Sequence, residues 1–257
     1  MANRIITYEV ADHVALVTMD NPPVNAQDRR FHEEMAQVMD ELGDREEVRA
    51  AVLTGAGKCF SAGADIKSQA GKEYGPGERS GHSRRVRECF HAIAECKAPV
   101  VAAINGPALG AGLTVAASCD LLVASEDAVI GLPEIDVGLL GGGRHAMRLF
   151  GHSLARRMML TGYRVAGPEL YRLGVVEACV PAADLLDAAM GLAAEIASKS
   201  PVATRLAKHA LNTIEEMSLR DGYRFEQEMT AELSKTEDSK EAKLAFVEKR
   251  KPIFKGK

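Results

Sequence analysis

Residues 104–120 read INGPALGAGLTVAASCD, and residues 60–67 read FSAGADIK. In each stretch a predicted strand runs into a turn of small residues that leads to a helix. Such a turn can direct a bare backbone N–H at an anionic oxygen, and two N–H groups that converge on one oxygen form an oxyanion hole. The pair of turns therefore predicts acyl chemistry on a thioester or a similar carbonyl, through an enolate-like anion.

The elements expected around these turns alternate between strands and helices. Such strand–turn–helix units predict a layered α/β core, and the chain after residue 184 is expected to be almost wholly helical. The glycine-rich residues 68–83 are expected to form a mobile surface loop. The expected strands cover a hairpin within 4–19 and residues 50–54, 100–104, 121–123 and 128–130. The expected helices cover residues 28–42, 84–97, about 106–118, about 143–161, 185–198, 201–212 and 219–234.

The composition of the 257 residues limits the choice of compartment and partner. Hydrophobic residues make up 46%, which is enough for a sizeable core, and the net charge is -4. This balance gives no electrostatic reason to expect nucleic acid or a membrane as a partner. The chain contains five cysteines without Cys-x-x-Cys spacing, and no apolar run reaches the roughly 18 residues of a membrane span. With no signal peptide predicted either, we expect a cytoplasmic protein with reduced thiols.

Taken together, four motifs resemble those of the enoyl-CoA hydratase/isomerase (crotonase) superfamily, in order and over nearly the whole chain. They lie at residues 60–67, 104–120, 132–149 and 245–256. The resemblance implies the crotonase-like (ClpP/crotonase) fold, an α/β spiral of repeated ββα units with a C-terminal helical region. The implied core spans residues 1–195, and the implied trimerisation or capping region spans residues 196–257.

The same resemblance implies where a CoA thioester binds. The backbone N–H groups of Ala64 and Ala111 would form the oxyanion hole. Alanine can serve at position 111, where many members have glycine, because the donor is the main chain. Residues that would bind the CoA arm or the thioester are Ala62, Ala64, Asp65, Ile66 and Gly110. For Gly110, close packing of backbone is an equally good explanation. No metal site and no separate cofactor is expected, since the substrate carries coenzyme A.

The expected acid–base chemistry depends on two positions: one carries a glutamate, and the other departs from the family pattern. Glu134 stands at the second carboxylate position of a hydratase, and apolar neighbours should raise its pKa toward the working range of a general acid/base. The first carboxylate position is Thr114, which carries no acid–base function near neutral pH. One carboxylate suits double-bond isomerisation, which we favour slightly over hydration. A hydratase for an unusual acyl group is the alternative, with Thr114 and Glu134 orienting the water.

Three further residues near Glu134 leave alternatives open. Asp136 would either replace the missing carboxylate or serve as a turn-former or cap. Arg144 and His145 would either contact an unusual acyl group or face solvent from the first turn of a helix. Within the superfamily, a dehalogenase, a decarboxylase and a C–C hydrolase share the oxyanion hole. A non-catalytic CoA-ester binder is a different class, and the presence of Glu134 argues against it.

The resemblance also implies assembly of the chain into a homotrimer or homohexamer. Three C-terminal residues would then contribute to a neighbouring subunit's CoA site, namely Phe246, Phe254 and Lys255.

Overall fold

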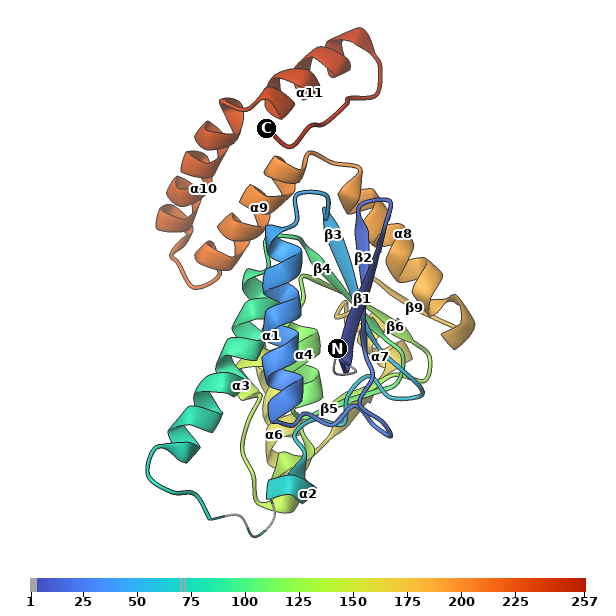
Figure 1. Ribbon diagram of the computed structural model, residues 1–257, viewed down its shortest axis with the longest axis vertical. Coiled ribbons are helices and arrows are strands. Elements are labelled where there is room, and N and C mark those ends of the chain that lie inside the picture. The colour runs from blue at the N-terminus through green and yellow to red at the C-terminus, as the bar shows by residue number, and fades with distance from the viewer. Residues whose placement is uncertain (1–3, 70, 72) are drawn as a thin grey trace.

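A computed structural model describes residues 4–69, 71 and 73–257. Its fold is built on a six-stranded sheet (Figure 1). The strand order is β1-β2-β3-β4-β6-β9, with β1 and β2 antiparallel and the later neighbours parallel. The predicted hairpin and the predicted strand over residues 100–104 are confirmed. The strands are β1 Ile6–Ala11, β2 Val14–Met19, β3 Ala50–Gly55, β4 Val100–Ile104, β6 Leu121–Ser125 and β9 Ala178–Val180.

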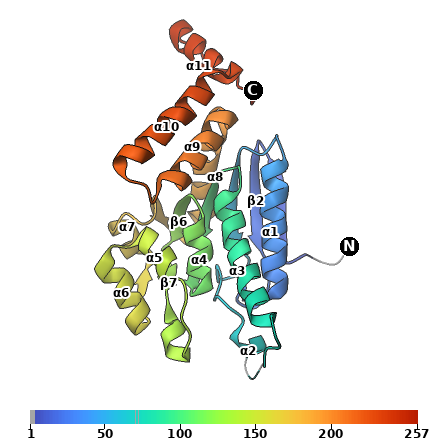
Figure 2. The same ribbon diagram turned by 90° about the vertical axis from the view of Figure 1, so that its left-hand side faces the viewer.

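Helices cover both faces of this sheet. On β3, Ala51 and Leu53 face a core shared with α1 (Arg29–Asp44), α3 (Glu78–Glu95) and α4 (Ala111–Ser118). The alternate residues Ala50 and Val52 pack instead on α8 (Leu185–Ala197). Because both faces are buried, these parallel strands are continuous apolar runs without polar alternation. Figure 2 shows α1, α3 and α4 side by side on their face of the sheet.

A second sheet has three strands, one of which covers residues that were predicted to be helical. Its strands are β5 (Pro107–Leu109), β7 (Val129–Gly131) and β8 (Arg164–Ala166), in that order. The helix expected directly after Asn105-Gly106 therefore begins only at Ala111, because Pro107–Leu109 pairs with β7.

The helix expected to run through residue 161 is two helices, α5 (Gly143–Leu149) and α6 (His152–Thr161). Phe150 leaves the helical conformation at φ -124° and ψ 145°, and Gly151 caps the second helix. The remaining elements of this region are η1 Pro133–Val137, α7 Gly167–Arg172 and η2 Ala182–Asp184.

The loop predicted over residues 68–83 is shorter than expected, because helices cover both of its ends. The helix α2 covers Ile66–Gln69, and α3 begins at Glu78 rather than at Arg84. Gly77 supplies the left-handed turn before α3 with φ +81°, and the Glu78 carboxylate accepts a hydrogen bond from the Gly75 N–H. Residues 70 and 72 of the predicted loop lie outside the described residues.

The C-terminal region is helical, as predicted, and extends away from the sheet (Figures 1 and 2). It consists of α9 (Pro201–Ile214), α10 (Leu219–Ser234) and α11 (Glu237–Glu248). The buried Lys208 on α9 donates to Asp120 Oδ2 at 2.7 Å, which fixes α9 to the core. The domain boundary at 195/196 stays a prediction. Within residues 4–69, 71 and 73–257, no helix combines the length and the apolar character that crossing a bilayer requires.

Candidate active site

The first small-residue turn follows β3 and is held on both sides by backbone hydrogen bonds. Ser61 pairs with Ala108 of β5, and Ala64 pairs with Gln27 in a parallel bridge. In this bridge Gln27 N–H donates to Gly63 O at 2.8 Å and Asp65 N–H donates to Gln27 O at 3.0 Å. In a parallel pair with this pattern, the N–H of Ala64 itself points away from Gln27. Ala64 is also exposed, so its N–H is available to a ligand.

The second turn follows β5 and ends at the first residue of α4. Gly110 precedes the helix with φ +57° and ψ -122°, and its N–H donates to Gly131 O at 2.9 Å. The first N–H groups of a helix have no acceptor within it. Ala111 is the first residue of α4, so its N–H is one of these unpaired donors.

The two turns touch each other at glycines. A Cβ on Gly63 would lie 3.0 Å from the N of Ala111 and 2.5 Å from the O of Leu109, and a Cβ on Gly112 would overlap the Ser61 carbonyl. Gly63 also has φ +87°, which side chains with a Cβ rarely adopt. The absence of a Cβ at these positions therefore brings the segment that carries Ala64 against the start of α4.

The side chain of Glu134, on η1 after β7, extends to the second turn and lies beside Gly110. A Cβ on Gly110 would lie 2.6 Å from Glu134 Oε1, and a Cβ on Gly141 would lie 4.0 Å from it. Among the described residues, the buried Oε2 atom of Glu134 has no hydrogen-bond partner. Burial raises the pKa of the Glu134 carboxyl, and a hydrogen bond from its own backbone N–H opposes this effect. A carboxyl group in such a place is suited to carry a proton.

The departure from the two-carboxylate pattern lies next to this glutamate. Thr114 on α4 is only 2% exposed, and its Oγ1 would be 3.2 Å from a Cβ on Gly142. Gly142 follows Gly141, so the Thr114 hydroxyl and the Glu134 carboxylate lie near adjacent residues of one glycine turn. That the Thr114 hydroxyl and the Glu134 carboxylate act on one substrate stays a prediction.

The three neighbours with open roles lie in different surroundings. Asp136 Oδ2 would be 2.9 Å from a Cβ on Gly162, which ends α6, so this carboxylate faces α6. Arg144 is an exposed partner of Glu216 and Glu215 beyond α9. His145 packs at 5.7 Å, ring centre to ring centre, against Phe90 of α3, and burial lowers its pKa. Of these three residues, His145 packs on a buried side chain of the main core, Asp136 faces α6, and Arg144 forms exposed ion pairs.

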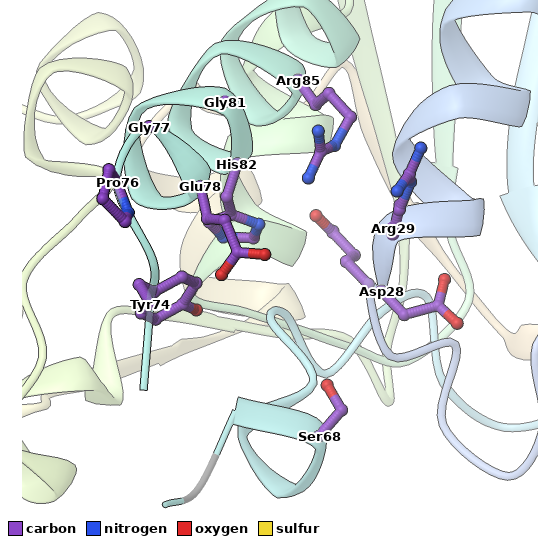
Figure 3. A pocket seen from close by; sticks show the side chains of 11 residues that line it. Asp28, Arg29, Ser68, Tyr74, Pro76, Gly77, Glu78, Gly81, His82 and Arg85 are labelled. Carbon is purple, nitrogen blue, oxygen red and sulfur yellow. The ribbon is translucent and has the colours of Figure 1, made fainter. Parts of the chain in front are cut away.

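A cavity of about 430 Å³ lies beside the first turn, between the starts of α1, α2 and α3 (Figure 3). Ser68 of α2 forms one wall, and Figure 3 shows the side chains of His82, Glu78 and Tyr74 opposite Asp28 and Arg29. Gln27, the partner of Ala64, also lines it.

A row of rings runs from this cavity toward α5. The ring of His82 lies 6.2 Å from that of His32, which lies 6.5 Å from that of Phe90, and Phe90 contacts His145. Burial lowers the pKa of His32 to about 4, so its ring is neutral near pH 7. These rings therefore pack α1, α3 and α5 against one another.

Four of the five predicted CoA-binding residues lie together on the first turn, and the fifth, Gly110, lies on the second turn. Ala62 and Ala64 are exposed, Asp65 is half-buried and Ile66 is 43% exposed. Sequence reasoning missed Gln27, which is fully buried and bonded to both neighbours of Ala64. No motif singles out Gln27, because its role follows from pairing with a segment far along the chain.

The cysteines are all unpaired thiols. Burial raises the pKa of each thiol, which disfavours the reactive thiolate. No three side chains of His, Cys, Asp or Glu in the described ranges form a group that could hold a metal ion.

Known proteins are similar to this chain in sequence and in fold. The family model for enoyl-CoA hydratase/isomerase matches residues 9–257. A (7aS)-7a-methyl-1,5-dioxo-2,3,5,6,7,7a-hexahydro-1H-indene-carboxyl-CoA hydrolase of Rhodococcus jostii is 37% identical, over 94% of this chain and 93% of that one. A short-chain-enoyl-CoA hydratase of Clostridium acetobutylicum is 37% identical, over 97% and 96%. The crystal structure of an enoyl-CoA hydratase from Bacillus anthracis superposes with a TM-score of 0.92 at 33% identity, over 98% and 100%. The chain is thus a member of the enoyl-CoA hydratase/isomerase family, has the crotonase fold, and belongs to a group of enzymes that act on CoA thioesters.

Proposed function

We propose that the protein moves the double bond of an enoyl-CoA thioester, with Glu134 as its only proton-carrying carboxylate. The observation that carries this proposal is the position of Glu134 against Gly110, directly before the unpaired N–H of Ala111. A carboxylate and an oxyanion donor so placed can act on the same thioester.

In this mechanism the thioester oxygen accepts hydrogen bonds from Ala64 and Ala111. Two such donors lower the energy of the enolate, and in known enzymes the loss of one costs about 3 to 4 kcal/mol. The contact between Gly63 and Ala111 supports this pairing of donors. The partial positive charge at the start of α4 adds to the stabilisation of the anion.

Glu134 then moves one proton within the substrate. Its carboxylate removes a proton from C2 of a 3-enoyl thioester, and the electrons form a dienolate whose oxygen rests between the two N–H groups. The protonated Glu134 returns the proton at C4, which leaves a 2-enoyl thioester and an ionised Glu134. The raised pKa of Glu134 supports both steps, because it brings the acid and base forms closer in energy near neutral pH.

Hydration is the less favoured reaction because Thr114 and Asp136 do not supply a second carboxylate beside Glu134. Thr114 is a hydroxyl, and Asp136 faces Gly162. A second candidate is hydrolysis, because the Rhodococcus jostii relative is named a hydrolase of a dioxo-hexahydroindene-carboxyl-CoA, and C–C hydrolases belong to the family that the sequence resembles. It would use the same oxyanion donors, with Glu134 activating a water.

We further propose a cytoplasmic trimer or hexamer that needs no cofactor beyond the coenzyme A of its substrate. Large apolar side chains exposed on and around the last two helices support assembly, since single chains rarely expose many of them together. They include Leu219, Phe246 and Val247, which are 91%, 85% and 76% exposed. The residues proposed to bind the CoA thioester are Ala62, Ala64, Asp65, Ile66 and Gly110.

The experiment is turnover of a 3-enoyl-CoA and, separately, a 2-enoyl-CoA in oxygen-18 water, followed by mass spectrometry. Unlabelled 2-enoyl-CoA from the 3-enoyl ester is the expected result. A labelled 3-hydroxyacyl-CoA as main product would replace isomerisation by hydration. A lack of turnover with either ester, together with labelled acid from a 7a-methyl-1,5-dioxo-hexahydroindene-carboxyl-CoA, would favour the hydrolase.

A further inference from the structure

We infer that the hydroxyl of Ser61, together with the Gln27 amide bonded to it, positions the N–H of Ala64 for the oxyanion. This inference rests on the proposed function, because it takes the Ala64 N–H to be an oxyanion donor. Ser61 and Gln27 are both 0% exposed, so they act through the backbone of the first turn and touch no substrate.

The hydroxyl of Ser61 uses every hydrogen-bonding position that a hydroxyl has. It donates its one proton to Asn25 O at 2.7 Å. Its oxygen accepts from Gln27 Nε2 at 3.1 Å and from the Gly63 N–H at 3.3 Å, which fills both of its acceptor positions. This side chain therefore joins the segment before α1 to the first turn from inside the protein.

These bonds select which N–H of the first turn stays free. The N–H groups of Ala62 and Asp65 donate to backbone oxygens of the segment before α1, at 2.9 and 3.0 Å. The N–H of Gly63 donates to the Ser61 hydroxyl. Among the described residues, Ala64 alone in this run has no acceptor for its N–H. Without the hydroxyl, Gly63 would carry a second unpaired donor directly before Ala64.

The main chain of the same serine contacts the second turn. The Ser61 N–H donates to Pro107 O at 3.1 Å, and the Leu109 N–H donates to Ser61 O at 3.0 Å. A Cβ on Gly112 would overlap this Ser61 carbonyl, so α4 begins directly against it. Ser61 thus lies between the segments that carry the two oxyanion donors, and a shift of Ser61 changes the distance between them.

The effect on the reaction follows from the direction of these donors. A hydrogen bond weakens steeply as its angle falls, and an oxyanion hole works because its donors are already aimed at the developing charge. Ser61→Ala removes three hydrogen bonds and leaves the Gly63 N–H and the Gln27 amide without this acceptor. These groups can find new acceptors only if the turn moves, and such a movement changes the direction of the Ala64 N–H.

We therefore expect kcat of Ser61→Ala to fall by about tenfold or more. The Kd for a saturated acyl-CoA should stay within a few-fold of wild type, because oxyanion donors hold the anion more tightly than the neutral thioester. A serine that only supported the fold would lower the Tm without this separation of kcat from binding.

The test measures the polarisation of the thioester directly. A saturated acyl-CoA with carbon-13 at the thioester carbonyl has no double bond to move, and infrared difference spectroscopy gives the frequency of its C=O stretch. Two N–H donors should lower this frequency in the wild type relative to the free ester, and Ser61→Ala should lose about half of the shift or more. Ser125→Ala is the matched control, because Ser125 is also 0% exposed and its hydroxyl has no partner among the described residues. It should keep both the shift and the turnover of the wild type.

A wild-type frequency shift in Ser61→Ala would overturn the inference, whatever the Tm of the variant. If Ser61→Ala fails to fold, Gln27→Met decides the matter, since it removes the donor to the Ser61 oxygen, and an unchanged shift there would overturn the inference equally. A shift that depends on Ser61, in a protein that isomerises no enoyl-CoA, would refute the proposed reaction and support the positioning role. Isomerisation by a protein whose shift does not depend on Ser61 would do the reverse.

Discussion

The carboxylate of Glu134 lies against Gly110 at the place that a side chain on residue 110 would occupy. A Cβ built there would be only 2.6 Å from Glu134 Oε1. Gly110 also has φ +57°, and its N–H is held by Gly131, the last residue of β7. The segment that ends just before Glu134 is therefore bonded to the turn that presents Ala111, so the proton carrier and one oxyanion donor are fixed together.

The first prediction concerns this contact. In Gly110→Ala the new Cβ should displace the Glu134 carboxylate, and a displacement of about 1 Å can cost on the order of 100-fold in turnover. The positive φ adds a backbone cost of about 1 to 2 kcal/mol in the free energy of unfolding. Steady-state kinetics and thermal unfolding measure the two effects.

Gly57→Ala is the matched control for Gly110→Ala. Gly57 has φ +74°, and a Cβ there would meet nothing within 4 Å. It should lose similar stability and keep wild-type turnover. Equal loss of turnover in both variants would show that the position of Glu134 against Gly110 does not matter.

The second prediction concerns Glu134 itself. Glu134→Gln keeps the shape of the side chain and removes its proton-carrying ability, so turnover should fall by about 10² to 10⁴-fold. Binding of a saturated acyl-CoA should stay within a few-fold of wild type, because the oxyanion donors are backbone groups. Asp136→Asn, which changes a carboxylate beside α6, should keep turnover. Unchanged turnover in Glu134→Gln would refute the mechanism.

The third prediction is a pH dependence with a defined sign. Burial raises the pKa of Glu134, so the ionised base forms only above the range of an ordinary glutamate, whose pKa is about 4.3. The kcat/KM for isomerisation should therefore fall as pH falls through this raised pKa. A profile that is flat down to the ordinary range would contradict it.

The stability of the wild-type protein should change with pH in the opposite sense. A carboxyl whose pKa is raised on folding favours the folded state while it is protonated, and this advantage is lost as pH rises through the folded pKa. Glu134→Gln should thus have a higher Tm than wild type at neutral pH, and the difference should shrink as pH falls through the raised pKa and reach its minimum below about pH 4.3. Thermal unfolding of both proteins across this range measures the difference.

The fourth prediction concerns the attachment of α9. Lys208 has a 5% exposed side chain and donates to Asp120 and to two backbone carbonyls. Lys208→Met leaves Asp120 without its cation, and because the Asp120 side chain is still 24% exposed, we expect a cost of about 1 to 3 kcal/mol in the free energy of unfolding. Lys97→Met removes an exposed pair with Asp44 and should cost less than about 1 kcal/mol. Urea unfolding that gives equal losses would rule out a special role for the buried pair.

Sequence reasoning identified the family and the strands of the main sheet because both depend on short local patterns. The run at residues 100–104 is apolar throughout and bounded by Pro99 and Asn105, and it is the strand β4. The hairpin over β1 and β2 likewise follows from alternation and a short turn. Glu134 was found because it occupies a position in a motif. Of the apolar neighbours expected to bury it, Leu132 is buried, but four are exposed, namely Ile135, Val137, Leu139 and Leu140. The burial of its carboxylate therefore comes from other segments, such as the turn at Gly110.

The features that sequence reasoning missed depend on contacts between distant segments. The strand β5 exists because residues 107–109 pair with β7 on one side and Ser61 bridges Ala108 on the other. Gln27 enters the site only through its pairing with Ala64. The glycine-rich composition before Arg84 hid the start of α3, because Gly77 acts there as a left-handed cap and not as part of a long loop.

The last prediction concerns Thr114, where the hydratase pattern has its first carboxylate. Thr114→Glu would place a second carboxyl by Gly142, next to the turn that borders Glu134. Two carboxyl groups can hold and activate one water, so we expect this variant to convert a 2-enoyl-CoA to 3-hydroxyacyl-CoA at least about tenfold faster than wild type. Label from oxygen-18 water in the product measures the reaction.

Thr114→Gln has the same size without the proton-carrying group and serves as the control for repacking of this 2% exposed position. A gain in Thr114→Glu alone would show that the residue at position 114 selects between hydration and isomerisation. The same rate of hydration in both variants would show that position 114 does not make this choice.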